Sequence, residues 1–173
     1  MKLTNRWAGS IAKKSKSPLT KAKDKAWDEF SIFIRTRDCI KYGGSLTEGI
    51  CVTCNRPYPF KKLQAGHFIA GRTNAILLDE DLVHTQCFGC NMGRSGAHVE
   101  YFVWMEKTYG RDAIDIFRRR KSETLKMNRQ DWLDQKAYWK KRTEALIAAH
   151  SSDPYGERLQ ELIRLGKTLP NNT

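Results

Sequence analysis

The chain has 173 residues, and its 31 Lys and Arg against 19 Asp and Glu give a formal net charge of +12. Hydrophobic residues make up 40% of it, which is enough for one modest core and too many for a wholly disordered chain. No run approaches the ~18 apolar residues of a membrane-spanning helix, and the N-terminus lacks the apolar stretch of a signal peptide, so we expect a one-domain cytoplasmic protein.

The N-terminal segment carries more than half of the net charge. Residues 1–25 hold eight Lys and Arg against one acid, Asp24. Basic side chains near phosphates release condensed counterions, so the charge favours a polyanionic partner over a merely soluble basic protein. We expect residues 1–23 to form a basic, flexible arm that could lie along phosphates, with a solvated tail of no special role as the alternative.

The first predicted element is a helix over residues 24–38. Trp27, Phe30, Phe33 and Ile34 recur at helical spacing, and the pattern ends near Gly43. After it, between residues 50 and 96, short apolar pieces alternate with Gly, Pro and Asn. This texture is typical of brief strands and loops organised around something other than a large core.

Two Cys-x2-Cys pairs, separated by 32 residues, are the strongest signal in the chain. They are Cys51 with Cys54, and Cys87 with Cys90. Four thiolates complete a tetrahedral set and leave no open position, so they predict a structural Zn²⁺ rather than a catalytic one. A redox pair is the alternative, but it would leave the second pair unexplained. Cys39 is left over, and we expect it to be an ordinary buried thiol.

Between the two pairs, residues 62–69 predict a short strand that carries His67. The run after Cys87 could open a helix whose first turn holds the last two zinc ligands, with Asn91 facing His67. The metal would then pin a strand to a helix.

Helices return in the C-terminal half. Val99, Phe102, Val103 and Glu106 predict one face of a helix that ends at Gly110, and Ile114, Ile116 and Phe117 mark a short one after it. Asn128 with Asp131 can cap a longer helix that carries Trp132 and Trp139, and Asp153-Pro154 opens a final helix. The fold class is therefore α+β and mostly helical: a small zinc module at 50–96 within a domain spanning 24–150, followed by a helix and tail at 151–173.

The module also resembles a known family. Ala65-Gly66-His67-Phe68, followed by His84-Thr85-Gln86-Cys87 and Asn91, looks like the phage recombination endonucleases called NinG or Rap, of the HNH or ββα-metal nucleases. The resemblance implies a treble-clef-like ββα-metal module and a divalent-metal-dependent endonuclease. Its implied partner is branched DNA, such as Holliday junctions and D-loops, in the bacterial host. A homodimer and host or phage recombination proteins are further possible partners.

By the same resemblance, His67 is the general base, and Asn91, with His84, holds a catalytic Mg²⁺ or Mn²⁺. An imidazole can deprotonate water at neutral pH, and a cation can stabilise charge on the phosphate. The sequence departs from the HNH pattern at Gly66, where many members have Asp, and at Leu82, where they have Asn. Either His84 or the acidic loop of Asp79, Glu80 and Asp81 could compensate, but His84 could equally brace that loop.

Basic side chains around this module are candidate DNA contacts, because guanidinium and ammonium groups bind phosphate without reading bases. Salt bridges and solvated faces are the alternatives. Two rival functions remain: a non-catalytic zinc-containing DNA-binding protein, and an HNH nuclease that cuts ordinary duplex or single-stranded DNA. The candidate contacts are Lys61, Lys62, Arg72, Arg94, Arg118, Arg119, Arg120, Lys140 and Lys141.

Overall fold

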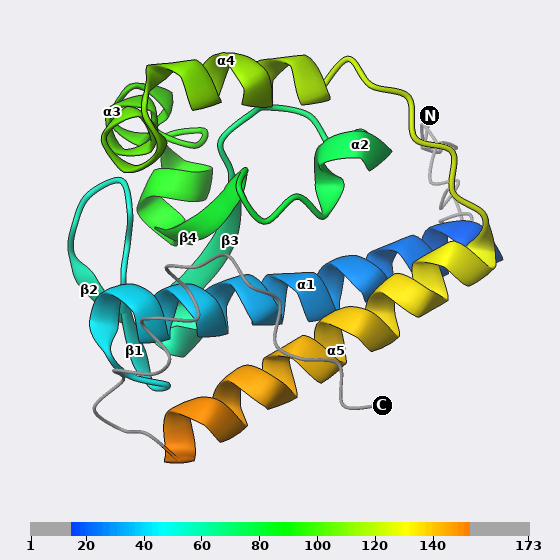
Figure 1. Cartoon of the computed structure of the whole chain (residues 1–173), viewed down its shortest axis with the longest axis horizontal. Helices are drawn as coiled ribbons and strands as arrows, with labels where there is room; N and C mark the ends of the chain where they lie inside the picture. The colour runs from blue at the N-terminus through cyan, green and yellow to red at the C-terminus, as the bar shows by residue number, and fades with distance from the viewer. Residues whose placement is uncertain (1–14, 153–173) are drawn as a thin grey trace, which may run out of the picture.

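The computed structural model describes residues 15–152, and its two long helices frame the molecule. Helices α1 (Pro18–Gly43) and α5 (Arg129–Ser152) pack side by side and run in the same direction, with the remaining elements in the chain between them (Figure 1). The final helix expected after Asp153, and most of the predicted basic arm, lie outside the described residues.

Local signals set the ends of α1. The Ser17 hydroxyl accepts a hydrogen bond from the Thr20 amide (3.1 Å), Pro18 occupies the first turn, and Gly44 ends the helix with a φ of 62°. Proline fits the first turn because it lacks an N–H, and glycine adopts positive φ without a steric penalty. The helix predicted for residues 24–38 is confirmed and is longer at both ends. Residues 18–23 belong to it, although they were expected in the arm.

Two small antiparallel sheets hold the centre of the chain. Strands β1 (Glu48–Ile50) and β2 (Pro57–Pro59) form one, and β3 (Leu63–His67) and β4 (Val83–Cys87) form the other. A 3-10 turn, η1 (Phe60–Lys62), leads into β3, and β3 confirms the strand predicted within residues 62–69. The short helix α2 (Asn74–Leu77) lies in the β3–β4 connection. One face of β3–β4 packs on α1, because Ala65 and Val83 join the apolar cluster of Phe30 and Ile34.

Helices α3 (His98–Tyr109) and α4 (Arg111–Arg120) confirm two predicted helices, but their buried faces differ from those expected. Tyr101 and Met105 are buried on α3, whereas Val99 and Val103 are 76% and 60% exposed. On α4, Ile114 and Phe117 are buried, and Ile116 is exposed. Tyr101 and Met105 are four positions apart and Ile114 and Phe117 are three apart, so each pair shares one helix face, and it is this face that packs on the core.

Helix α5 begins as its sequence predicts. Asn128 Oδ1 accepts from the Gln130 and Asp131 amides, and Asp131 Oδ2 accepts in turn from the Asn128 amide (2.7 Å). This reciprocal capping satisfies amides that have no partner within the helix. Trp132 and Trp139 are both buried, and Trp139 packs between Phe30 and Phe33 of α1. The two long helices are thus joined by an aromatic core.

The segment after Cys87 departs from its predicted form. Cys87 ends β4, and Cys90 lies in a five-residue π-helical turn, η2 (Gly89–Gly93), which Arg94 terminates. Ala97, with a φ of 46°, separates this turn from α3. The predicted helix beginning with both zinc ligands is therefore wrong: one ligand belongs to a strand end and the other to an isolated turn.

Among residues 15–152, no helix is both long and apolar enough to cross a membrane.

Candidate functional site

Four cysteine sulfurs gather where the two sheets meet. Cys51 and Cys54 lie in the turn between β1 and β2, and Cys87 and Cys90 lie at the end of β4 and in η2. Their Sγ atoms all fall within 4.8 Å of one another, and those of Cys54 and Cys87 are 4.0 Å apart. A tetrahedral zinc with Zn–S bonds of about 2.3 Å requires sulfurs about 3.8 Å apart. The cluster therefore fits a structural Zn²⁺.

The surroundings of the cluster favour a cation over free thiols. Burial raises the pKa of Cys54 to about 12, so at neutral pH this sulfur would be a thiolate only with a cation bound to it. Arg94 donates from Nη2 to the Cys90 sulfur (2.9 Å), and the Thr53 hydroxyl lies 3.1 Å from the Cys51 sulfur. Such contacts orient metal-bound thiolates. Arg94 also pairs with Glu100, so this predicted DNA contact is engaged within the protein.

Cys39 does not belong to the cluster. It is fully buried near the end of α1, and burial raises its pKa to about 12, which confirms the prediction of an inert buried thiol. A Cβ on Gly49 would lie 2.4 Å from the Cys39 sulfur, so only glycine lets β1 approach α1 this closely. The fifth cysteine thus packs the zinc module against α1 without binding its metal.

His67 ends β3 and has an unusual set of partners. Its ring stacks on Trp27 of α1, with centroids 4.9 Å apart and planes 18° apart, and its Nε2 lies 3.2 Å from the Leu77 carbonyl oxygen. A carbonyl accepts only, so Nε2 carries the proton and Nδ1 keeps a lone pair. Burial, with a smaller effect of Arg72, lowers the pKa of His67 to about 4, although the Leu77 contact opposes this. The ring is therefore neutral at pH 7.

The structure does not bring Asn91 to His67. Asn91 donates from Nδ2 to Gln64 Oε1 (2.9 Å), and Gln64 precedes His67 by three residues on β3. Side chains at odd spacing leave opposite faces of a strand. Gly66 lies between Gln64 and His67 on β3, and a Cβ placed on it would lie only 2.0 Å from Gln86 Oε1. The Gln86 side chain therefore occupies the place where the HNH pattern has a carboxylate.

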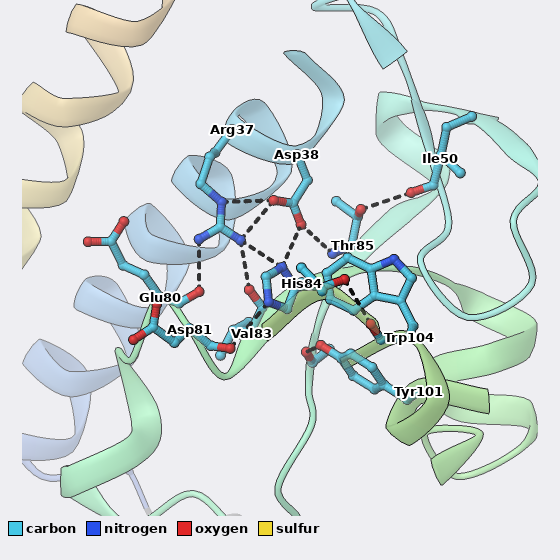
Figure 2. A network of polar contacts seen from close by, with 12 residues as sticks. Arg37, Asp38, Ile50, Glu80, Asp81, Val83, His84, Thr85, Tyr101 and Trp104 are labelled. Carbon is cyan, nitrogen blue, oxygen red and sulfur yellow. Dashed lines mark hydrogen bonds and ion pairs between the residues drawn. The ribbon is translucent and has the colours of Figure 1, made fainter. Parts of the chain in front are cut away.

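His84 lies within a buried polar network, which Figure 2 shows. The side chain is 1% exposed; Nδ1 accepts from Arg37 Nη2 (3.0 Å), and Nε2 lies 3.2 Å from the Asp81 carbonyl oxygen. Burial lowers the pKa of His84 below its usual value, although Asp38 opposes this. Neither ring nitrogen is left for a cation, so His84 braces the loop in this structure, as the second interpretation expected.

Asp38 and Arg37 form the charged centre of that network. Arg37 Nη2 lies 2.7 Å from Asp38 Oδ1, and the other carboxylate oxygen accepts from the Thr85 amide (2.8 Å). Arg37 also donates to the carbonyl oxygens of Glu80 and Val83. Burial alone would raise the pKa of Asp38, but Arg37 and His84 outweigh it and hold that pKa well below its usual range. The pair fastens α1 to β4 and its preceding loop.

We expect Asp38→Asn to lower the free energy of unfolding by about 3–5 kcal/mol, because Arg37 would remain buried without a counter-charge. Urea unfolding of the zinc-loaded protein measures the change, with the exposed Asp28→Asn on the same helix as the control. The carboxylate stabilises the fold above its unfolded pKa of about 4, so the parent should lose this contribution as the pH falls below that value. A loss equal to that of Asp28→Asn would show that the pair contributes little.

Two arginines form ion pairs with the acidic loop that precedes β4. Arg120 contacts Asp79 (2.8 Å) and Asp81 (3.0 Å), and Arg142 contacts Glu80. Arg142 also lies over the Phe33 ring, with its Cζ 4.4 Å from the centroid. The loop is therefore tied to α4 and α5, and its carboxylates are engaged rather than open to a catalytic cation. Arg120, expected at DNA, is one of these ties.

The other candidate DNA contacts lie on several separate elements, and most are exposed. Arg72 lies over Trp27, with its Cζ 4.5 Å from the ring centroid, and Lys140 is 3.9 Å from Glu144. Those with exposed side chains are Lys61, Lys62, Arg72, Arg118, Arg119, Lys140 and Lys141. The structure therefore spreads positive charge over η1, the β3–α2 loop, α4 and α5.

Sequence reasoning missed Trp27 as a site residue and missed the Arg37–Asp38 pair. Trp27 was read as part of the core stripe of α1, yet its ring contacts both His67 and Arg72. Adjacent charged residues among Ile34, Cys39 and Ile40 were an available signal, because ionic side chains are rarely buried unless paired.

The fold defines an α+β protein built around a cluster of four cysteines that could hold a metal ion. A family model described as Bacteriophage Lambda NinG protein matches residues 4–148, and the chain belongs to that family. Membership points to a protein related to phage recombination. No curated protein matches the chain, and neither does any solved structure.

Proposed function

We propose that this protein is a DNA endonuclease that hydrolyses phosphodiester bonds in branched DNA during phage recombination, with His67 as the general base. Membership of the NinG family supports the recombination setting. Exposed basic side chains on several elements support a branched substrate, because separate duplex arms offer phosphates in several directions.

The placement of the His67 ring, stacked on Trp27 with Nε2 at the Leu77 carbonyl, is the observation that carries this proposal. A general base must be unprotonated at working pH and must present a lone pair in a fixed direction. The low pKa of His67 keeps the ring neutral, the Leu77 carbonyl fixes the proton on Nε2, and Trp27 holds the ring plane. Nδ1 would take the proton from the attacking water, and the ring would become a buried imidazolium that readily returns it.

The side chains expected to hold a catalytic Mg²⁺ or Mn²⁺ do not converge with His67. Asn91 pairs with Gln64, His84 is enclosed, and the acidic loop is bound by arginines. We therefore derive no catalytic step through a cation. The same lack of convergence favours a second candidate function, a zinc-stabilised protein that binds DNA without cutting it.

A cleavage assay distinguishes the two functions. The zinc-loaded protein is incubated with a labelled four-way junction, a linear duplex of the same arm sequence and a single strand, each in EDTA, Mg²⁺ or Mn²⁺. Our proposal predicts junction cleavage that exceeds duplex cleavage, and the reactions in EDTA show whether that cleavage requires a divalent cation. Equal cleavage of the duplex would indicate an ordinary HNH nuclease, and binding without cleavage would indicate the DNA-binding protein.

A further inference from the structure

Three basic side chains from distant parts of the chain reach the loop between β3 and α2, which follows His67 in the sequence. Lys23 of α1 reaches the start of α2, where its Nζ lies 2.7 Å from Asn74 Oδ1. Arg72 lies in the loop just before α2. Lys121 follows α4, and its Nζ is 3.9 Å from the place where a Cβ on Gly71 would lie. These three residues, here called the basic triad, are separated by 49 positions or more in sequence, and the fold gathers them around one loop.

The triad lacks the acidic partners that neutralise other arginines of this protein. Within residues 15–152, no ion pair involves Lys23, Arg72 or Lys121, whereas Arg120 and Arg142 are bound by the acidic loop. Burial lowers the pKa of Lys23 and Arg72 lowers it further, although the neighbouring Asp24, which forms its ion pair with Lys16, opposes this. Like charges held together raise the free energy of the folded protein, and a bound anion would relieve that repulsion.

Trp27 connects the triad to the general base. The Arg72 guanidinium lies over the Trp27 ring, and the His67 ring stacks on the same indole. A guanidinium placed on an aromatic ring keeps its N–H groups free at the edges, where they can bind phosphate oxygens. An anion at the triad is therefore within the immediate surroundings of His67.

We propose that Lys23, Arg72 and Lys121 together bind a single backbone phosphate of DNA, next to the phosphodiester that His67 attacks. This inference rests on the proposed function, because it takes the anion to belong to the substrate. The triad would fix the position of the strand without reading its bases. Trp27 is then a positioning residue that holds both Arg72 and His67.

Binding measurements in EDTA test the triad separately from cleavage. Fluorescence anisotropy with a labelled four-way junction is recorded over a range of salt concentrations for the parent, for Lys23→Gln, Arg72→Gln and Lys121→Gln, and for the triple variant. Lys107→Gln on α3, an element that Figure 1 places across the view from α2, is the matched control. Circular dichroism and zinc content confirm that each variant is folded.

We expect each single variant to weaken binding about tenfold, and Lys107→Gln to leave it unchanged. Because the three cations share one phosphate, the triple variant should reduce the slope of log K against log salt by about 0.9. A reduction of about 2.7 would instead mean three separate phosphates and would overturn the single site. Lys23→Arg keeps the charge, so it should bind like the parent.

Inorganic phosphate added to the parent distinguishes a free anion from the DNA backbone. At constant ionic strength, we expect millimolar phosphate to leave junction binding unchanged, because a mobile anion lacks the other contacts that hold the strand. Strong competition by phosphate would assign the triad to a free anion. If the variants bind DNA like the parent, the phosphate site at the triad is wrong, even if the protein cleaves DNA. If the variants bind more weakly but the parent never cleaves DNA, the phosphate site stands and the proposed nuclease activity is wrong.

Discussion

Replacing Cys87 by Ser is expected to release the bound zinc and to lower the free energy of unfolding by about 5 kcal/mol, with a fall in Tm of about 10–20 °C. The expected loss is large because a metal held by the cluster would join β4, through Cys87, to the β1–β2 turn. Without the fourth thiolate the remaining ligands no longer fill a tetrahedron, and the short strands have little apolar core of their own. Metal analysis and thermal unfolding by circular dichroism measure the two effects.

Cys39→Ala is the matched control for this prediction. Cys39 is as buried as the zinc ligands but lies outside their cluster, so its loss should leave the zinc content at one per chain. Cobalt substitution gives a second test, since four thiolates around Co²⁺ produce intense bands in the visible and near-ultraviolet. If Cys87→Ser retained stoichiometric metal and the parent melting temperature, metal binding by the four cysteines would not be what stabilises this fold.

For His67→Ala we expect junction cleavage to fall by about 10²–10⁴-fold, the contribution typical of a general base. Binding to the same junction in EDTA should remain close to that of the parent, because the ring is held by Trp27 and Leu77 rather than offered to DNA. Single-turnover cleavage separates the chemical step from binding. His98→Ala, which removes an exposed histidine from α3, should cleave like the parent.

The protonation state of His67 provides an independent check. Because its pKa lies near 4, the ring should remain neutral, with the proton on Nε2, as the pH falls from 8 to 6. Nitrogen-15 spectra of the imidazole distinguish the two tautomers and the imidazolium. A folded-state pKa near 6.5 would contradict the burial of the ring but not its use as a base, whereas a proton on Nδ1 would contradict the role that we propose, even if His67→Ala were inactive.

Local patterns predicted most elements of the fold. The caps of α1 and α5, the strand that bears His67 and the paired cysteines all depend on residues within a few positions of one another. The buried faces of α3 and α4 were harder to predict, because neighbours from other parts of the chain decide which side chains pack into the core. Tyr101, for example, packs in an apolar cluster with Phe68, and its buried hydroxyl donates to the Gly66 carbonyl oxygen, 35 residues earlier.

The sequence predicted the four cysteines of the candidate metal site, but it did not predict the buried polar network around Asp38. Spacing alone predicted the four-cysteine cluster that the structure shows, and a family motif suggested His67, whose role remains our proposal. The contact of Asp38 with the Thr85 amide spans 47 positions, and no local pattern records it. Likewise, the charges of Arg120 and Arg142 resemble DNA contacts in sequence, and only the fold reveals that they hold the acidic loop. Long-range pairing decides which basic residues are left for a partner.

The common direction of α1 and α5 has a consequence for how the chain folds. Two neighbouring helices that run the same way need a connection that carries the chain back across the molecule, and here residues 44–128 form it (Figure 1). The entropy lost on closing such a loop grows with its length, and contacts between residues far apart in sequence slow folding. A metal held by the four cysteines would join Cys54 to Cys87 within the connection and so shorten the loop that must close before Trp139 reaches Phe30. Metal binding would then favour an order of assembly in which the return path is organised first and the long helices dock last.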